Sequence, residues 1–243
     1  IQYTTHCQSY GWLPWSANGE MNGTEGEAKR LEAIQIVIVK KGESFDHAIG
    51  NIQSARGEAY IASSTANANP VVTGENNVNV EYRTHVQSFG WQGWKYNGMM
   101  SGTSGKAKRL EGINIKLTNK PYSGNIVYTT HVQSIGWQGN ENNVNTWFRD
   151  GQMAGTSGRA KRLEAIRIAL TGEMAEHYDV YYRVHAQTYG WLAWTKNGEA
   201  AGTAGLSKRL EGIQIVLVPK GGAAPANNYG GVVTTNKQTY IKK

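Results

Sequence analysis

The chain has 243 residues, 39% of them hydrophobic and 18% charged, with 30 glycines, a single cysteine and a net charge of +7. This composition is typical of a globular protein rich in tight turns, and it excludes a disordered chain, a membrane-spanning apolar run and an intrachain disulfide framework. More than half of the charge excess lies in a recurring Lys-Arg-x-Glu motif that carries its own acid, so we do not expect nucleic acid as a partner.

The first predicted strand begins at Tyr3 and opens a motif that recurs three more times. In every copy the tryptophan follows the histidine by six residues, and an Arg-Leu-Glu-x-Ile segment comes later. From that tryptophan to the arginine is 18 residues in three copies and 25 in the third, where a polar insertion between Trp137 and Trp147 marks a surface loop. The four copies are residues 1–38, 82–119, 128–172 and 182–219 (copies 1 to 4).

The strand that opens each copy alternates between two faces. In copy 2, Tyr82 and Val86 share one face. Arg83 and His85 share the other. An Asn-Gly or Asp-Gly pair follows in every copy, and this pair predicts a hairpin turn because both of its residues adopt positive φ.

The last predicted strand of each copy begins with a glutamate. In copy 3, Glu164 has the parity of Ile166 and Ile168, so we expect the carboxylate to point toward the apolar side. A buried carboxylate without a partner is strongly unfavourable. We therefore predict a structural Arg–Glu or His–Glu contact in each copy. The ion-pair residues are Arg30, Glu32, Arg109, Glu111, Arg162, Glu164, Arg209 and Glu211, with the four motif histidines as alternative donors.

All eight tryptophans lie in the copies, two in each. Indole rings stack on sugars and also offer an N–H donor, although both members of a pair can instead belong to the core. We predict that the second tryptophan of each pair faces a ligand, with the motif histidine as a polar contact. The predicted glycan-binding residues are Trp15, Trp94, Trp147, Trp194, His6, His85, His131 and His185. A structural role is the alternative for the histidines. One histidine per copy does not indicate a metal site, and we expect no metal or cofactor.

Two segments fall outside the copies. Residues 39–81 share no motif with them, and we predict a connector or an inserted hairpin there. Residues 220–243 begin with a flexible Gly- and Ala-rich stretch, and we predict a tail whose end supplies a closing strand.

Each copy reads as three or four short strands that cannot bury their hydrophobic face alone, so the copies must pack together. We predict an all-β, pseudo-symmetric repeat fold of short antiparallel strands, β-trefoil-like or β-prism-like, with copies 2 to 4 as one compact unit. A four-membered arrangement closed by copy 1 is the alternative.

The order of these motifs resembles the clostridial hydrophobic-with-tryptophan (ChW) repeat family. The match comprises Tyr-x-x-His-Val-Gln-x-x-Gly-Trp, then Asn-Gly, Gly-Thr-x-Gly and Arg-Leu-Glu-x-Ile, in four copies over more than half of the chain. Cys7 and Ala186 replace the valine in copies 1 and 4, and copy 3 has Asp-Gly in place of Asn-Gly. The resemblance implies a secreted or cell-surface protein of a Gram-positive, clostridium-like bacterium that binds polysaccharide or other proteins.

We therefore expect a non-catalytic binding module for cell-wall or other polysaccharide glycans, in which linked weak sites raise avidity. A structural or adhesive module that contacts a surface protein is the alternative. An enzyme is disfavoured because a single active site is a non-repeated cluster, whereas each promising polar residue here appears four times.

Overall fold

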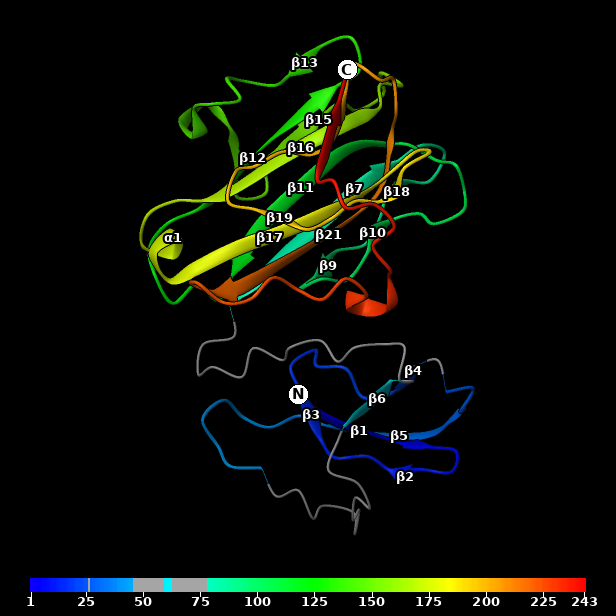
Figure 1. Cartoon of the computed structure of the whole chain (residues 1–243). Helices are drawn as coiled ribbons and strands as arrows, with labels where there is room; N and C mark the ends of the chain where they lie inside the picture. Colours follow the sequence, from blue (N-terminus) through cyan, green and yellow to red (C-terminus); the bar gives the residue numbers. More distant parts are fainter. Residues whose placement is uncertain (26, 46–58, 63–77) are drawn as a thin grey trace. The chain divides into compact units, whose positions relative to one another are not determined.

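The computed structural model describes residues 1–25, 27–45, 59–62 and 78–243. Strands dominate this part of the chain, and its helical elements are α1 (Glu173–His177) and two 3-10 turns, η2 (Val144–Thr146) and η3 (Tyr229–Gly231). The chain divides into two compact units, Ile1–Ala68 (unit 1) and Asn69–Lys243 (unit 2), both drawn in Figure 1. The predicted all-β repeat fold is confirmed. The choice between a trefoil-like and a prism-like arrangement stays a prediction.

Unit 1 contains copy 1 and one further strand. Its strands are β1 (Gln2–Cys7), β2 (Gly11–Trp12), β3 (Ser16–Ala17), β4 (Gly23–Glu25), β5 (Leu31–Val37) and β6 (Tyr60–Ala62). β1 pairs antiparallel with β2, β3 and β5, whereas β4 pairs in parallel with β6. The predicted connector, 39–81, lies partly outside the described residues. Its described part contains β6 and the first three residues of β7 (Asn79–Val86), which begins before the predicted start of copy 2.

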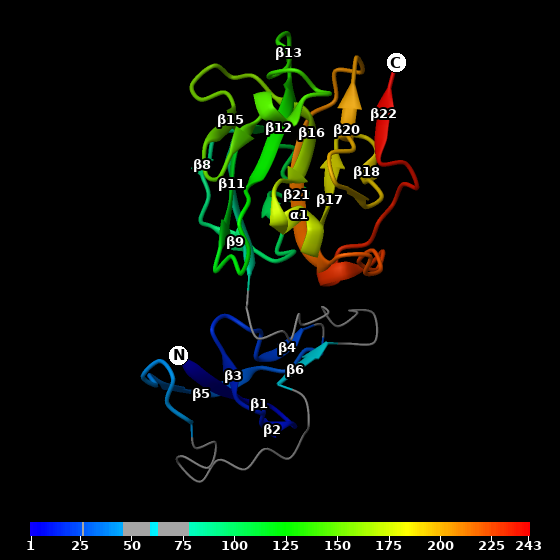
Figure 2. The same cartoon turned by 90° about the vertical axis from the view of Figure 1, so that its left-hand side faces the viewer.

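Unit 2 repeats the same set of strands three times. Copy 2 contributes β7 (Asn79–Val86), β8 (Gly90–Trp91), β9 (Lys95–Tyr96), β10 (Ser101–Gly102) and β11 (Leu110–Thr118). Copy 3 contributes β12 (Ile126–Val132), β13 (Gly136–Trp137), β14 (Phe148–Arg149), β15 (Met153–Gly155) and β16 (Leu163–Leu170). Copy 4 contributes β17 (Tyr178–Ala186), β18 (Gly190–Trp191), β19 (Thr195–Lys196), β20 (Ala201–Ala204) and β21 (Leu210–Pro219). The tail ends in β22 (Tyr240–Lys242), which lies parallel to β20, as Figure 2 shows.

The three copies of unit 2 are joined by exchange of their short strands. β15 of copy 3 pairs with β11 of copy 2, and β20 of copy 4 pairs with β16 of copy 3. β10 of copy 2 then pairs with β21 of copy 4, which closes the series. Each copy therefore lends one short strand to the sheet of another, and three copies suffice to close the ring without copy 1.

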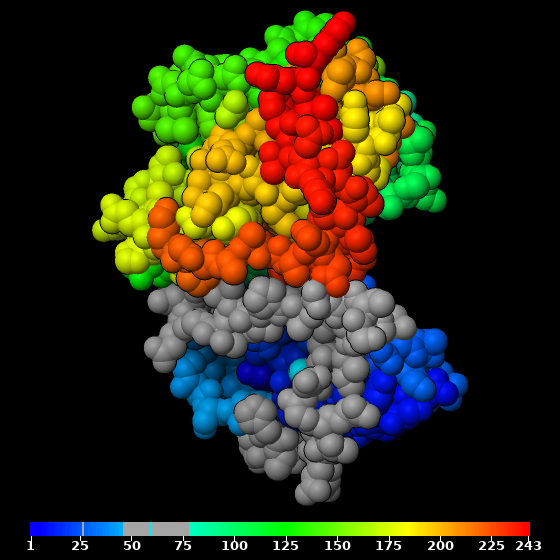
Figure 3. Space-filling model, in the orientation of Figure 1, coloured from blue at the N-terminus to red at the C-terminus, as the bar shows by residue number. Residues whose placement is uncertain are grey.

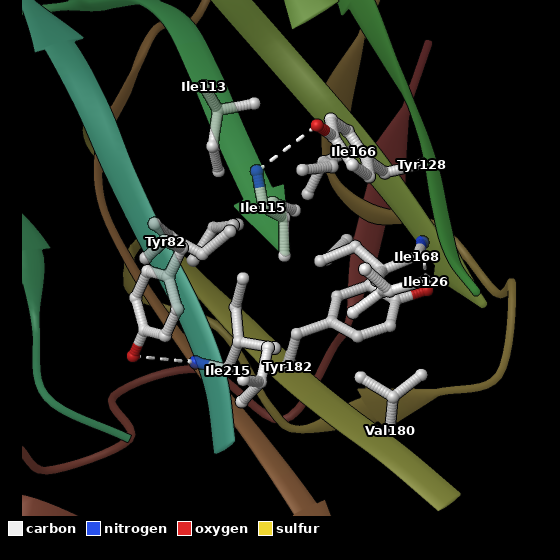
Figure 4. Packing of buried hydrophobic residues seen from close by; sticks show 14 of the residues in the cluster. Tyr82, Ile113, Ile115, Ile126, Tyr128, Ile166, Ile168, Val180, Tyr182 and Ile215 are labelled. Atoms are coloured by element: carbon white, nitrogen blue, oxygen red, sulfur yellow. Dashed lines mark hydrogen bonds between the residues drawn. The ribbon is translucent and has the colours of Figure 1, made fainter. Parts of the chain in front are cut away.

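A tyrosine from each copy ties the ring together at its core. The hydroxyls of Tyr82, Tyr128 and Tyr182 accept hydrogen bonds from backbone N–H groups of a neighbouring copy, those of Ile215, Ile115 and Ile168, at 3.0 to 3.1 Å. Figure 4 shows these rings among the buried isoleucines of all three copies. Burial raises the pKa of all three tyrosines, so their hydroxyls are neutral. Each hydroxyl also donates to a backbone carbonyl of its own copy, so it links two copies.

Candidate functional site

Each long hairpin contains a β-bulge at the motif glutamate. In copy 2, Leu110 pairs with Val86, and two residues later Gly112 pairs with His85. Glu111 therefore has no cross-strand partner, and the same register shift occurs in the other three copies. A bulge re-aims the side chain of the extra residue. The glutamates of copies 2 to 4 are buried as predicted, with exposed fractions of 5% to 6%, but the bulge places them beside the histidines and not among the core isoleucines.

The glutamate lies between the histidine and the arginine of its own copy. The distance from His Nδ1 to Glu Oε2 is 3.1 Å in copies 1 to 3 and 3.4 Å in copy 4. An arginine nitrogen lies 2.7 to 3.1 Å from the other carboxylate oxygen. The structure thus brings together all the residues predicted as ion pairs. The four clusters are His6–Glu32–Arg30, His85–Glu111–Arg109, His131–Glu164–Arg162 and His185–Glu211–Arg209.

The arginine, and not the histidine, is the main counter-ion of the carboxylate. In copies 2 to 4 the Nδ1 atom is buried and makes no aligned hydrogen bond, despite its short distance from the glutamate. Burial lowers the pKa of His185; Glu211 acts to raise it and Arg209 to lower it further. His185 is consequently neutral at pH 7. A half-buried, neutral ring favours a structural role for His185.

The first tryptophan of each copy packs on this cluster. Its ring meets the histidine ring nearly edge-on, with centroids 5.4 to 5.6 Å apart and interplanar angles of 74° to 81°. In copies 2 and 4 it also covers a strand glycine: a Cβ at Gly112 or Gly212 would lie 3.5 or 3.3 Å from the indole. The first tryptophans, which are Trp12, Trp91, Trp137 and Trp191, therefore have a packing role.

In copy 2 an arginine lies between the two tryptophans. The guanidinium carbon of Arg83 is 4.9 Å from the ring centroid of Trp91 and 4.8 Å from that of Trp94. Lys116 Nζ lies 4.5 Å from the Trp94 centroid, and Arg83 Nε donates to Asn114 at 3.2 Å. Trp94 is 36% exposed. We call Trp91, Arg83, Trp94 and Lys116 the copy-2 face; it presents an indole and two cations to solvent.

Copy 4 has the same arrangement, but its own tail covers it. Arg183 lies 5.4 and 4.5 Å from the centroids of Trp191 and Trp194, and it is completely buried. The tail, coloured red in Figure 3, lies across this copy. Its acceptors for the Arg183 guanidinium are the carbonyls of Asn227, Tyr229 and Val232 and the hydroxyl of Thr234, at 2.6 to 3.0 Å. The Trp194 indole N–H also donates to a tail carbonyl, at 3.2 Å.

Copy 3 departs from the predicted exposure of its second tryptophan. Trp147 is only 4% exposed and packs against Val127 and Ala169. Its indole N–H donates to the Asn140 carbonyl at 2.8 Å. The polar insertion, which includes η2, folds back and supplies this acceptor, so Trp147 offers no open ring to a ligand.

Copy 1 differs again at the same place. Thr4 occupies the position of Arg83, and the Trp15 ring lies 4.8 Å from that of Phe45 in an edge-on contact. Trp15 and Trp194 are half-buried, and of the eight tryptophans, all within the described part of the chain, Trp94 is the exposed one. The copies thus share the His–Glu–Arg cluster and differ in the surface outside it.

Sequence reasoning missed the cations of this surface. Arg83 shares a strand face with His85, so the alternation already placed it beside the predicted site. A repeat pattern highlights residues that all four copies share, whereas this arginine occurs only in copies 2 and 4. Lys116 has no counterpart at all in the other copies.

Within residues 1–25, 27–45, 59–62 and 78–243, no group of three or more His, Cys, Asp or Glu side chains is placed to hold a metal ion. No helix there is long and apolar enough to cross a membrane.

The ring of exchanged strands and the repeated His–Glu–Arg–Trp cluster define an all-β repeat module with three related copies in unit 2. The sequence model of the Clostridial hydrophobic W (ChW) family matches residues 6–40, 85–119, 131–172 and 185–219, more than half of the chain. The chain therefore belongs to the ChW family, which confirms the resemblance seen in its motifs. No curated protein and no solved structure matches the chain significantly.

Proposed function

We propose that this chain is a non-catalytic, secreted or cell-surface binding module, and that its ligand is a glycan of a bacterial cell surface. The ligand contacts the copy-2 face. The observation that carries the proposal is the exposed Trp94 flanked by two cations, at a position where the equivalent surface of copy 4 is already filled by the tail.

The chemistry of the copy-2 face suits a hydroxyl-rich or acidic polymer. An exposed indole offers apolar surface to a sugar ring, and arginine and lysine donate hydrogen bonds to hydroxyl, carboxylate or phosphate oxygens. Of the two cations of the copy-2 face, Lys116 pairs with Glu81 at 3.1 Å. Arg83 bonds the amide of Asn114 and has no acidic partner among the described residues. Teichoic acid and acidic polysaccharides are therefore preferred over neutral sugars.

A polypeptide is the second candidate ligand, and copy 4 supports it directly. There the tail supplies three backbone carbonyls and a threonine hydroxyl to Arg183, and Tyr229 packs edge-on against Trp194 at 5.7 Å. An extended peptide of another protein that binds the copy-2 face in this way would present the same acceptors to Arg83.

The experiment is a binding titration of the chain against purified teichoic acid, peptidoglycan and a glycan array, beside a synthetic peptide with the sequence of residues 223–236. Trp94→Ala is the test variant. Because one buried aromatic side chain contributes about 1.5 to 3 kcal/mol, we expect it to weaken binding at least about tenfold.

Phe89→Ala is the matched control, because Phe89 is an exposed aromatic residue (56%) of the same copy outside the copy-2 face. Glycan binding that is lost with Trp94→Ala and kept with Phe89→Ala supports the proposal. Binding of the peptide alone, again dependent on Trp94, selects the polypeptide ligand. Equal affinities for both variants contradict the assignment of this face.

A further inference from the structure

Copy 1 exposes the apolar strand face that its counterparts bury. Leu31, Ile34, Ile36 and Ile38 of this copy are 55% to 84% exposed. The equivalent residues of copy 4, which are Leu210, Ile213, Ile215 and Leu217, are 0% to 5% exposed. Contiguous apolar surface of this kind marks an interaction site in a soluble protein.

Unit 2 shows what covers this face: two further repeats. Ile215 receives the Tyr82 hydroxyl at its backbone N–H, and its carbonyl accepts from Gly98 N at 2.7 Å, both across the junction between copies 4 and 2. Copies 2 to 4 use all three of their junctions on one another. They therefore leave no equivalent edge for copy 1.

Copy 1 keeps the backbone shape that this junction requires. Gly102, Gly155 and Gly202 have φ between +98° and +122°, and a Cβ on any of them would lie 2.3 to 2.4 Å from a glutamate carbonyl of the adjacent copy. Gly23 has the same conformation, with φ +135°, yet the nearest atom to its Cβ position is 4.0 Å away. A glycine needed for close approach is thus present where the described residues place no neighbour.

A side-chain donor for the junction is also present. In unit 2, a side chain in the middle of the last strand of each copy donates to the carbonyl of the turn glycine of the adjacent copy, at 2.8 to 2.9 Å. These donors are Asn114 to Gly151, Arg167 to Gly198 and Gln214 to Gly98. Gln35 occupies the same position in copy 1, and its neighbours Ile34 and Ile36 match those of Gln214.

Two features make copy 1 resemble copy 4, the last repeat along the chain in the ring of unit 2. In copies 2 and 3, Gln92 and Gln138 bond both backbone groups of the short-strand glycine. Copies 1 and 4 have leucine instead, Leu13 and Leu192, and a parallel strand follows each of them. The residue just before that strand accepts from the glycine: Gly23 N donates to Ala59 O and Gly202 N to Thr239 O, both at 3.0 Å.

We propose that the apolar face of copy 1 docks a tandem pair of ChW repeats of the glutamine type, and that copy 1 completes a three-membered ring with them as its last repeat. The partner is defined by its chemistry: two consecutive repeats that carry the tyrosine, the turn glycine and the glutamine of copies 2 and 3. Copy 1 supplies the third tyrosine, the exposed strand and the closing tail strand.

The test adds such a pair to the intact chain. Ile1 corresponds to Val180, because the carbonyls of both accept from the asparagine of the following turn. Residues 78–179 can therefore be joined directly to Ile1 with the native spacing. Hydrogen exchange at the Ile36 amide is the readout, since the matching amides of Ile115, Ile168 and Ile215 bond a tyrosine of the next copy. We expect this exchange to slow at least about a hundredfold in the fusion.

Ile34→Lys in the same fusion is the control. Ile34 is 55% exposed in the free copy, so the charge leaves copy 1 folded but prevents burial of the face, and exchange at Ile36 should return to the rate of the unfused chain. Unchanged exchange in the fusion overturns the proposal. Self-association of the unfused chain to three times its 26.7 kDa, with Ile36 protected, also overturns it, because the occupant is then another copy of this chain.

Discussion

Substitution of Gly202 by alanine tests the strand exchange that joins the copies of unit 2. A Cβ at this position would lie 2.4 Å from the Glu164 carbonyl oxygen and 2.7 Å from the Ala165 Cα, both backbone atoms that cannot rotate away. The positive φ of +122° disfavours alanine by about 1 to 3 kcal/mol, and the overlap adds about 1 to 3 kcal/mol. We expect Gly202→Ala to lower the free energy of unfolding of unit 2 by about 2 to 6 kcal/mol.

Gly23→Ala is the matched control because it separates the two contributions. Its φ is +135°, but no atom lies closer than 4.0 Å to the Cβ position, so unit 1 should lose only the conformational part. Urea titrations followed by hydrogen exchange and mass spectrometry report each unit separately, which a single spectroscopic transition of a two-unit chain does not. Equal losses for the two alanine variants would refute the close approach at the junction.

Three further predictions concern polar side chains of unit 2 that are wholly or partly buried. Arg183→Met removes the donor to three tail carbonyls, so we expect the free energy of unfolding of unit 2 to fall by about 3 kcal/mol or more. Proteolysis within residues 223–239 should become faster, and cleavage at the parental rate would contradict this. The lowered pKa of His185 means that the unfolded chain binds the proton more tightly, so the stability of unit 2 is complete above about pH 6.5 and falls as the pH drops through the folded pKa. The urea midpoint of unit 2 should depend less on pH between 5 and 8 in His185→Gln than in the unaltered chain. Identical profiles would rule out His185 as a source of the pH dependence. Burial alone would raise the pKa of Asp179, but hydrogen bonds from Asn197, Lys220 and Lys196 outweigh burial and hold it well below its usual range. Its contribution is therefore complete above about pH 4 and declines as the pH falls toward the folded pKa, so Asp179→Asn should destabilise less at pH 2 than at pH 7, as thermal unfolding at the two pH values will show.

The repeat pattern predicted the elements of the fold well because each copy carries complete local signals. Alternation placed Tyr82 and Val86 inward, and Asn97-Gly98 marked the hairpin turn, where both residues adopt positive φ. The β-bulge was not predictable from parity, since one extra residue reverses the face of everything before it. Glu111 consequently lies beside His85 and not in the core.

The candidate site was less predictable because it depends on differences between the copies. Comparison of the copies stresses what they share, and the shared cluster is largely buried in copies 2 to 4. The open surface of copy 2 depends on Arg83 and Lys116. The covered surface of copy 4 depends on tail residues that follow Arg183 by 44 to 51 positions. No local sequence motif predicts that the tail packs over copy 4.

Closure of unit 2 by copies 2 and 4 is the central structural claim, and the Ile215 amide tests it most directly. Its N–H donates to the hydroxyl of Tyr82, a residue 133 positions earlier in the chain, at 3.1 Å. In the closed ring this amide exchanges with solvent only through unfolding of unit 2, and Tyr82→Phe accelerates its exchange well beyond that of Ile168, which bonds Tyr182. Rapid exchange of Ile215 in the unaltered chain, at the rate of an open strand edge, would contradict the closed three-copy ring.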